Sequence, residues 1–513
     1  MTPFLDWYRQ RGFRNDRPWL VFGKGPSFAK RANVDLTAFY TLALNHAVRE
    51  QPVMVAHMID LDVLDQCSAA IDANAEVVLL PWVPHVRNRA GAANLGQLVL
   101  EHPMLRQLDA QDRLLWYNLC TSPHHRDGSP VVDVRYFSSE AALRLLAMAG
   151  ATRIRSLGID GGASYSSEFA DLTDKTLLAN SRSTFDRQFE EIARIIMTTG
   201  VDYAPLDVES PIRVFVAATD AQMLAVKVLE FSIRKHASMS VEVSSLHLTG
   251  LAIPTPKDAA NLPRTPFSFQ RFLIPAVKAY RGRAIYVDSD MQVFKDIRDL
   301  WTQPFNGSDL LTVREPSASA RHPQFSVMLL DCEALTWNIA DIIAGLDTRQ
   351  YTYEQLMQEM CVAKRIGVTI DPEWNSLERY TEGKTALLHY TDMPTQPWVV
   401  SSNPLGYLWV RDLLEAVDTG FLSIDFVRDQ VERSFVRPSL LYQLEHRVDD
   451  PLLLPKAARA LDDRFVAPYQ SLPSGRRTGL RRVAAWLRAA TRRAYERTPL
   501  FALERKLRER LDR

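Results

Sequence analysis

Cysteine is scarce in this chain, and its spacing shows no pairing pattern. The 513 residues contain four cysteines, Cys67, Cys120, Cys332 and Cys361, which are widely separated and form no Cys-x-x-Cys pair. This pattern argues against a disulfide framework and against a structural zinc site. We therefore expect the four side chains to pack as small apolar residues.

Long apolar runs are also lacking. No run reaches the roughly 18–20 residues that a membrane-spanning helix requires, and the amino-terminal sequence MTPFLDWYRQRGFRNDRPW has no apolar signal-peptide core. We therefore expect a cytoplasmic protein. Its hydrophobic content of 46% and charged content of 24% are those of ordinary globular domains. At this length we expect two or three domains of ~150–250 residues.

The chain has no net charge, but its charges are unevenly distributed. Residues 474–513 contain 13 Lys and Arg against 4 Asp and Glu, which gives this tail a charge of +9. Apolar residues recur there every three or four positions, with Trp486 alongside, which is typical of a helix that lies on the anionic inner face of a membrane. The alternative is a helix that docks on the protein itself or on a second subunit. Nothing resembles a base-reading module, so we expect no nucleic-acid partner.

Short apolar runs alternate with amphipathic stretches in two series, divided at Pro205–Pro211. This alternation predicts an α/β fold with mostly parallel sheets. In the second series it includes a strand at 241–248 and a helix at 269–280. We predict four parts: a Rossmann-like α/β domain at 1–207, a second α/β domain with a mixed sheet at 210–400, a helical extension at 401–473 and the basic amphipathic tail at 474–513.

Asp288 and Asp290 form the most informative pair in the sequence, because they follow the apolar run 284–287 at positions i and i+2. In an extended strand, such side chains point to the same face. Paired carboxylates with substrate phosphates are how proteins hold Mg²⁺ or Mn²⁺. The alternative is a polar turn after a strand, in which aspartate is also favoured.

The second series resembles glycosyltransferase family 8, metal-dependent retaining sugar transferases with a GT-A nucleotide-binding domain, over about Ile212–Trp398. The resemblance rests on four segments in order: VAATD at 216–220, SFQRFLIP at 268–275, YVDSDMQVFKDIRDLW at 286–301 and HYTDMPTQPW at 389–398. It implies transfer of a sugar from a UDP-linked nucleotide-sugar to a cell-surface polysaccharide or lipid-linked oligosaccharide acceptor.

The resemblance also implies roles for individual residues. Asp288, Asp290 and His389 would hold Mn²⁺ or Mg²⁺, and the imidazole favours Mn²⁺. The donor contacts would come from Thr219, Asp220, Arg271, Asp288 and Gln396. A lysine is expected where Gln396 stands, so a cationic contact to the diphosphate is missing or supplied elsewhere.

Two further segments have candidate roles near the transferred sugar. Glu354 or Gln355 matches the family's catalytic position near the anomeric carbon, and Arg271 is the third candidate there. The alternative is that Gln355, Leu356 and Met360 lie on an ordinary helix. Trp374 and Asn375 follow a proline-fixed turn and correspond to a segment near the acceptor pocket. The alternative for this pair is a buried tryptophan beside an asparagine that caps a turn.

The amino-terminal domain contains WLVFGKGPSF at 19–28, in which glycines follow a strand. Gly23, Gly25 and Ser27 can present backbone N–H groups and a helix start to an anion. Together with GIDGGASYSSEF at 158–169, this segment resembles bacterial sialyltransferase-type and pterin diphosphokinase-like proteins. That resemblance implies a nucleotide phosphate site bordered by Asn45, His46, Asp160 and Ser164. The alternative is a domain whose glycines only serve a tight turn.

Three functional hypotheses follow from the sequence. The first is a metal-dependent hexosyltransferase in which the tail contacts the membrane. The second is a bifunctional enzyme with another transferase site in the amino-terminal domain. The third is a non-catalytic, membrane-associated assembly protein that retains the folds of transferases.

Overall fold

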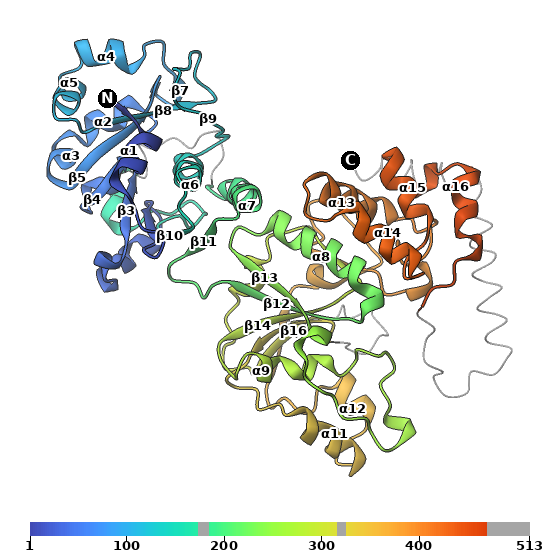
Figure 1. Ribbon diagram of the computed structural model, residues 1–513. Helices are drawn as coiled ribbons and strands as arrows, with labels where there is room; N and C mark the ends of the chain where they lie inside the picture. The colour runs from blue at the N-terminus through green and yellow to red at the C-terminus, as the bar shows by residue number, and fades with distance from the viewer. Residues whose placement is uncertain (173–183, 315–324, 469–513) are drawn as a thin grey trace. The chain divides into compact units, whose positions relative to one another are not determined.

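The protein is described from a computed structural model, which covers residues 1–172, 184–314 and 325–468. The chain forms two compact units: the first comprises Met1–Pro211 with Ala237–Ser240, and the second comprises Ile212–His236 and the residues from Val241 onward (Figure 1). Within these described ranges, no helix has both the length and the apolarity to cross a bilayer. The basic tail at 474–513 lies outside them, so its membrane contact stays a prediction.

The first unit is built on a nine-stranded sheet in which every strand pair is parallel. Parallel neighbours need crossover connections, and helices supply them here. The strands lie in the order β1 (Thr2–Pro3), β8 (Leu114–Leu119), β5 (Ala75–Pro81), β4 (Val53–His57), β3 (Tyr40–Leu44), β2 (Trp19–Phe22), β10 (Arg153–Leu157) and β11 (Asp202–Pro205), with β9 (Val131–Val132) beside β8.

Alternate residues of these strands enter two different apolar layers, because successive side chains of a strand point to opposite faces. Trp19 and Val21 belong to one layer, and Leu20 and Phe22 belong to the other. The first layer contains residues of α1 (Phe4–Arg11), α6 (Ser138–Met148) and α7 (Gln188–Thr199). The second contains residues of α2 (Leu61–Gln66), α3 (Ser68–Asn74), α4 (Leu95–Glu101) and α5 (Pro103–Ala110). The predicted α/β fold is confirmed.

Two strands of this sheet, β2 and β10, mark the point where the strand order reverses. From β2 the chain proceeds through β3, β4 and β5 toward one edge, and it returns to place β10 on the other side of β2. Glycines allow the segments after these strands to touch: a Cβ on Gly23 would lie 2.2 Å from the Gly158 carbonyl oxygen. In open α/β sheets, ligands bind at such a reversal, outside the carboxyl ends of the strands.

The second unit contains a six-stranded mixed sheet, as predicted. Its order is β13 (Val241–Ser245), β12 (Ile212–Ala217), β14 (Arg283–Asp288), β17 (Val327–Asp331), β16 (Leu310–Val313) and β18 (Ile366–Ile370). The strands β12, β13 and β14 are parallel, whereas β17 runs antiparallel to both of its neighbours. Its helices before residue 400 are α8 (Met223–His236), α9 (Ile274–Val277), α10 (Arg298–Trp301), α11 (Ile339–Asp347) and α12 (Tyr353–Gln358).

A small three-stranded sheet carries the chain from the Asp pair to the closing histidine. Its order is β15 (Met291–Val293), β20 (Leu387–His389) and β19 (Ser376–Leu377). Met291 pairs with His389 across the antiparallel ladder, and the Tyr390 N–H donates to the Asp290 carbonyl at 2.8 Å. This pairing brings residues about 100 positions apart in sequence to the same place.

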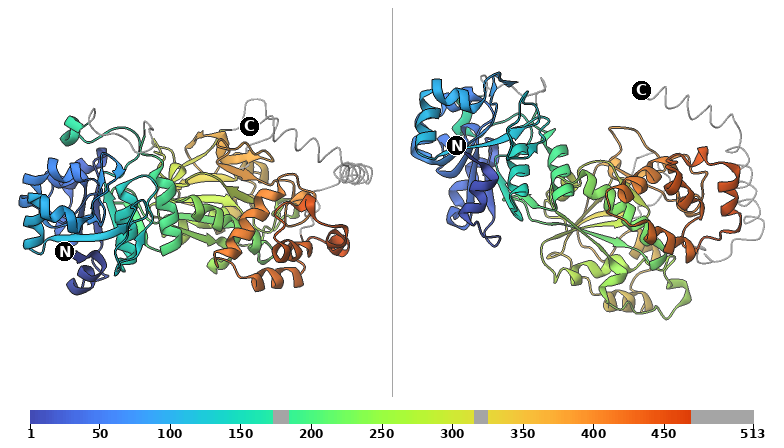
Figure 2. Two further views of the ribbon diagram at one scale, coloured as in Figure 1. Left: turned by 90° about the horizontal axis from the view of Figure 1, so that it is seen from above. Right: turned by 45° about the horizontal axis from the view of Figure 1, so that its top comes forward.

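The described residues 401–468 are mostly helical, as predicted, and form one cluster in the views of Figure 2, where they are drawn in orange to red. They comprise α13 (Gly406–Asp418), α14 (Ile424–Glu432), α15 (Ser439–His446) and α16 (Lys456–Ala460). A buried polar chain connects α13 to the small sheet. The Tyr390 hydroxyl donates to Gln292 at 2.8 Å, Gln292 donates to Asp412 at 2.5 Å, and Lys235 lies 3.0 Å from Asp412.

The structure also differs from the sequence prediction in two elements. The helix predicted at 269–280 is a short 3₁₀ turn, Gln270–Leu273, followed by the four-residue α9, because Ala279 and Tyr280 have φ values of 50° and 55°. Such a left-handed conformation ends a right-handed helix. The strand predicted at 241–248 ends at Ser245, where a 3₁₀ turn begins.

Candidate metal and donor site

Two parallel strands of the mixed sheet end side by side, and their carboxyl ends position the candidate site. Ala217 of β12 pairs in register with Asp288 of β14. The Gln270 side chain fixes the end of β12, because its amide donates to the Ala218 carbonyl at 2.8 Å and accepts from the Ala218 N–H at 2.9 Å. Residues that follow β12 and β14 therefore share one edge of the sheet.

Asp288, Asp290 and His389 meet at this edge, as the sequence predicts. Each offers one ligand atom, and these atoms all lie within 4.8 Å of one another. The side chains of the two aspartates are 13% and 18% exposed, and that of His389 is 4% exposed. The cluster is therefore largely withdrawn from solvent, although it contains two carboxylates.

His389 is oriented by Asn375, whose side-chain oxygen lies 2.9 Å from Nδ1. Because this oxygen is an acceptor, Nδ1 carries a proton and donates it. The other ring nitrogen, Nε2, lies 3.1 Å from Asp290 Oδ1. An unprotonated Nε2 and a carboxylate oxygen would repel each other at this distance, so the pair requires a proton or a metal ion between them. Burial lowers the pKa of His389, but the Asp290 and Asp288 carboxylates outweigh it and raise this pKa overall.

The second oxygen of Asp290 is held by Gln396, whose amide donates to Oδ2 at 3.0 Å and to the Tyr390 carbonyl at 2.9 Å. Gln396 is 3% exposed. Gln396, which stands where the sequence resemblance implies a lysine, therefore positions the carboxylate of a candidate metal ligand. The sequence indicated the substitution but gave no sign of this role.

Asp288 is held by two neighbours that also contact each other. The Tyr286 hydroxyl donates to Asp288 Oδ1 at 2.5 Å, and Arg271 Nη2 lies 3.6 Å from the same oxygen. The guanidinium lies over the Tyr286 ring at 4.7 Å, and its Nη1 donates to the Phe325 carbonyl at 3.1 Å. Burial raises the pKa of Tyr286 well above its ordinary value, so the phenol stays a neutral donor.

These residues fit a divalent cation in the chemistry of their donors. Two carboxylate oxygens and one imidazole nitrogen suit Mn²⁺ better than Mg²⁺, which prefers oxygen ligands alone. The Nδ1–H of His389 is bound by Asn375, as the outer nitrogen of a metal-ligating histidine usually is. The neighbouring groups thus leave His389 Nε2 and Asp290 Oδ1 directed at each other.

The other predicted site residues of this unit lie in different settings. Thr219 and Asp220 follow β12 at the same sheet edge, where Asp220 is exposed and its Oδ1 lies 3.2 Å from His247 Nε2.

The two candidate catalytic residues lie on α12. Gln355 accepts a hydrogen bond from the Thr352 N–H at 2.9 Å and so caps the start of α12. Glu354 forms an exposed ion pair with Arg264. The catalytic roles of Glu354 and Gln355 stay predictions, and both side chains are engaged in local contacts.

Gly23, Gly25 and Ser27 lie at the strand reversal of the first unit. The carboxylate of Asp160 already faces the start of the short helix there. Asp160 Oδ2 accepts from the Ser27 N–H at 2.7 Å, and Asp160 Oδ1 accepts from the Ser27 hydroxyl at 2.5 Å. A Cβ on Gly25 would lie 2.6 Å from this carboxylate. The two glycines therefore permit close packing of the segment after β10, and Asp160 occupies the position expected for a bound anion.

Replacing Asn375 tests its effect on the candidate metal ligand. Asn375→Ala should weaken Mn²⁺ binding about 10–100-fold, because His389 loses the partner that orients its ring. Asn375→Asp keeps an acceptor for Nδ1 and should bind Mn²⁺ at least as well as the unchanged protein. Calorimetric titration of Mn²⁺ in the presence of UDP measures both. Equal affinities of the alanine variant and the unchanged protein would contradict this role.

Comparison with known proteins finds no matching family model. One curated protein, Protein CDI of Arabidopsis thaliana, is 36% identical over 97 residues. That match covers 18% of this chain and 36% of the plant protein, so it spans about a third of that relative's length.

Solved structures similar to this chain are glycosyltransferases. The apo structure of the bifunctional glycosyltransferase WbbM has a TM-score of 0.31 and 13% identity over 47% of this chain and 60% of its own. GlyE of Streptococcus pneumoniae TIGR4 has a TM-score of 0.30 and 16% identity, with 39% and 60% covered. The galactosyltransferase LgtC, solved with donor and acceptor sugar analogues, has a TM-score of 0.29 and 12% identity, with 43% and 100% covered.

Proposed function

We propose that the second unit is a metal-dependent glycosyltransferase that moves a sugar from a nucleotide-sugar, UDP-linked in the first instance, to a glycan or glycolipid acceptor with retention of configuration. The observation that carries this proposal is the cluster of Asp288, Asp290 and His389 at the carboxyl edge of β12 and β14. A metal site at that edge lies beside residues 218–220, which the sequence motif assigns to the nucleotide.

The ligand set explains how such a site would assist departure of a nucleoside diphosphate. A bound divalent cation neutralises the charge that grows on the diphosphate as the bond to the sugar breaks. The protein contributes by fixing the donor atoms: Asn375 sets the ring of His389, and Gln396 holds Asp290. Because these groups are already ordered by the fold, little reorganisation is needed when charge develops.

Arg271 gives the site a fixed positive charge beside Asp288. Its guanidinium is anchored between the Tyr286 ring, the Phe325 carbonyl and the Asp288 carboxylate. The arginine therefore partly neutralises the charge of Asp288. A bound cation would stabilise the Asp290 carboxylate more than the Asp288 carboxylate. Since Gln396 carries no charge, the cation and Arg271 are the positive groups that we assign to the diphosphate.

A panel of nucleotide-sugars tests the proposed function directly. At about 100 times its dissociation constant, a true donor should stabilise the protein by about 2.7 kcal/mol when Mn²⁺ is present, and a chelator should remove the effect. Thermal melting of the full chain measures this, with each matching nucleoside monophosphate as the control. If Mn²⁺ changes the binding of no nucleotide-sugar in the panel, the result favours a non-catalytic assembly protein.

A further inference from the structure

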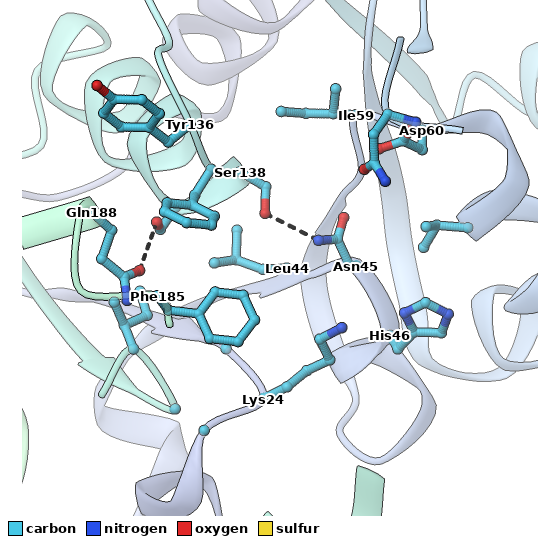
Figure 3. A pocket seen from close by; sticks show the side chains of 18 of the residues that line it. Lys24, Leu44, Asn45, His46, Ile59, Asp60, Tyr136, Ser138, Phe185 and Gln188 are labelled. Atoms are coloured by element: carbon cyan, nitrogen blue, oxygen red, sulfur yellow. Dashed lines mark hydrogen bonds between the residues drawn. The ribbon is translucent and has the colours of Figure 1, made fainter. Parts of the chain in front are cut away.

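The first unit contains a cavity of about 720 Å³ at the strand reversal (Figure 3). Its lining comes mostly from segments that follow parallel strands, among them β2, β3, β4, β5, β8 and β10, so it lies outside their carboxyl ends. This is the position at which open α/β sheets bind ligands, and the volume lies in the range of small-molecule sites. The cavity belongs entirely to the first unit and shares no residue with the metal cluster.

A lysine directs its charge into this cavity. Lys24 follows β2 between Gly23 and Gly25, and in Figure 3 its side chain extends toward Asn45 and His46. Its ammonium lies 4.8 Å from the centre of the Tyr165 ring. Among the residues that the structure describes, no carboxylate lies within ion-pair distance of it, whereas Lys30, six residues later, pairs with Asp207 at 2.6 Å.

The neighbouring groups do not neutralise Lys24. Burial is the main cause that lowers its pKa to about 8; of the smaller effects, Cys67 raises this pKa, Arg49 lowers it and Asp171 raises it, in decreasing order. His46 stays neutral near pH 7, because burial lowers its pKa to about 4. A half-buried cation that forms no ion pair with a carboxylate of the described residues is costly to keep in a protein interior. An anionic ligand would remove that cost.

The predicted anion position at the helix start is not available, since Asp160 fills it. The Ser27 N–H and hydroxyl both donate to that carboxylate, and the Ser27 hydroxyl oxygen accepts from the Gly158 N–H at 2.7 Å. An anion that enters the cavity therefore meets Lys24 and not the helix start, while Arg87 and Arg135, the other two Lys or Arg residues of the lining, are exposed. The structure therefore makes Lys24, and not Ser27, the candidate residue for binding an anion.

The remaining walls offer surfaces for a planar group and for hydroxyls. Phe185 and Tyr136 contribute aromatic rings (Figure 3). Asn45 has a φ of 53° and is held by a hydrogen bond of 3.0 Å from its amide to Ser138, so a strained backbone fixes a polar side chain in the lining. Asp60, which follows β4, adds a carboxylate of the kind that binds ribose hydroxyls at strand ends.

We propose that this cavity binds a nucleoside phosphate without a metal ion, and that Lys24 is the residue that recognises the phosphate. The aromatic rings would contact the base, and Asp60 and Asn45 would serve the sugar hydroxyls. This site is independent of the donor site proposed for the second unit. It gives the protein two nucleotide-binding sites, one metal-dependent and one metal-independent.

The test titrates nucleotides into the full chain carrying Asp290→Asn, with a chelator present, so that the metal-dependent site cannot contribute. The probes are the mono- and diphosphates of adenosine, cytidine, guanosine and uridine, together with inorganic phosphate, and calorimetry measures binding. At least one nucleotide should bind. Lys24→Met should weaken it about 10–100-fold, the range expected for losing a charge-assisted hydrogen bond. Lys30→Met is the matched control and should change nothing.

The pH dependence of the protein with Lys24 intact provides a second test that needs no loss of the side chain. The second pKa of a nucleotide phosphate is near 6, so its charge changes little between pH 7.5 and 9, and the protonation of Lys24 should dominate the change in binding over that range. Affinity should fall about tenfold over this interval, as the lysine loses its proton above a pKa near 8. Lys24→Arg stays charged throughout, and its affinity should be independent of pH in this range.

Three results would overturn the proposal. The first is that none of the nucleotides binds under these conditions, or that inorganic phosphate alone binds. The second is that Lys24→Met and Lys30→Met bind the nucleotide equally well. The third is that Lys24→Arg shows the same fall in affinity above pH 8 as the unchanged lysine.

Discussion

Replacing Asp290 by asparagine should abolish metal-dependent binding of the donor and lower sugar transfer at least a hundredfold, on the order expected for removing a principal electrostatic contact. The substitution keeps the shape of the side chain but removes its charge. It also offers the His389 Nε2 atom an N–H group in place of a carboxylate oxygen. His389 Nε2 and the side-chain amide of residue 290 would then form a hydrogen bond with each other, and no cation would be needed between them.

The fold should tolerate this change, because Gln396 can still donate to the remaining amide oxygen. Thermal melting of the variant without metal should stay close to that of the unchanged protein. Asp392→Asn is the matched control, since Asp392 is an exposed aspartate two residues after Tyr390, and it should leave activity unchanged. Full activity of Asp290→Asn would remove Asp290 from the metal site.

Replacing Arg437 by methionine should destabilise the second unit by about 2–4 kcal/mol. Arg437 is completely buried and donates to the Pro397 carbonyl at 2.8 Å, to the Ser439 hydroxyl and to the Gln443 side chain. Methionine fills a similar volume but leaves three buried acceptors without a donor, at about 1–3 kcal/mol each. Part of this loss is offset because a buried charge no longer needs to be desolvated.

The burial cost of this arginine is visible in its pKa, which desolvation lowers to about 10. It stays charged at neutral pH and connects the helical cluster to residues 397 and 398 of the closing motif, where its N–H also donates to the Trp398 carbonyl at 2.9 Å. Arg437→Lys retains the charge with fewer donors, so it should lie between the methionine variant and the unchanged protein. Denaturant unfolding of the full chain measures all three, and identical midpoints would contradict this role.

The metal cluster could be predicted from sequence because its members carry local signals. Asp288 and Asp290 directly follow an apolar strand, and His389 begins a motif with proline and tryptophan at recognisable spacing. Asn375 and Gln396 could not be assigned their roles, since these depend on the pairing of β15 with β20 across about 100 residues. A sequence pattern shows which side chains are present, but not which acceptor each one meets.

The phosphate site predicted at Gly23, Gly25 and Ser27 illustrates the same limit in the first unit. The glycine-rich segment correctly indicated a tight approach after β2. Whether the N–H groups there face a ligand or the protein depends on Asp160, which lies 133 positions after Ser27 and arrives only through the β2–β10 pairing. The importance of Lys24 follows from the same arrangement, because its environment is set by helices and loops from distant parts of the chain.

The fold class could be predicted from the sequence, since alternating apolar runs and helical stretches already indicate α/β domains. The pattern did not predict where some helices and strands end. The helix expected through Tyr280 stops early because two residues adopt positive φ, and no glycine marks either of them. Glu354 and Gln355 lie on a helix as the sequence suggested, and the engagement of both in local contacts could only be seen in three dimensions.

The central claim is that Asp288, Asp290 and His389 together hold a divalent cation that binds a nucleoside diphosphate. Electron paramagnetic resonance of Mn²⁺ titrated into the full chain, with and without UDP, tests it most directly. The structure predicts uptake of one Mn²⁺ per chain that is strengthened by UDP and lost when Asp288 and Asp290 are both changed to asparagine. Mn²⁺ uptake that is indifferent to UDP, or unchanged in the double variant, would contradict the claim.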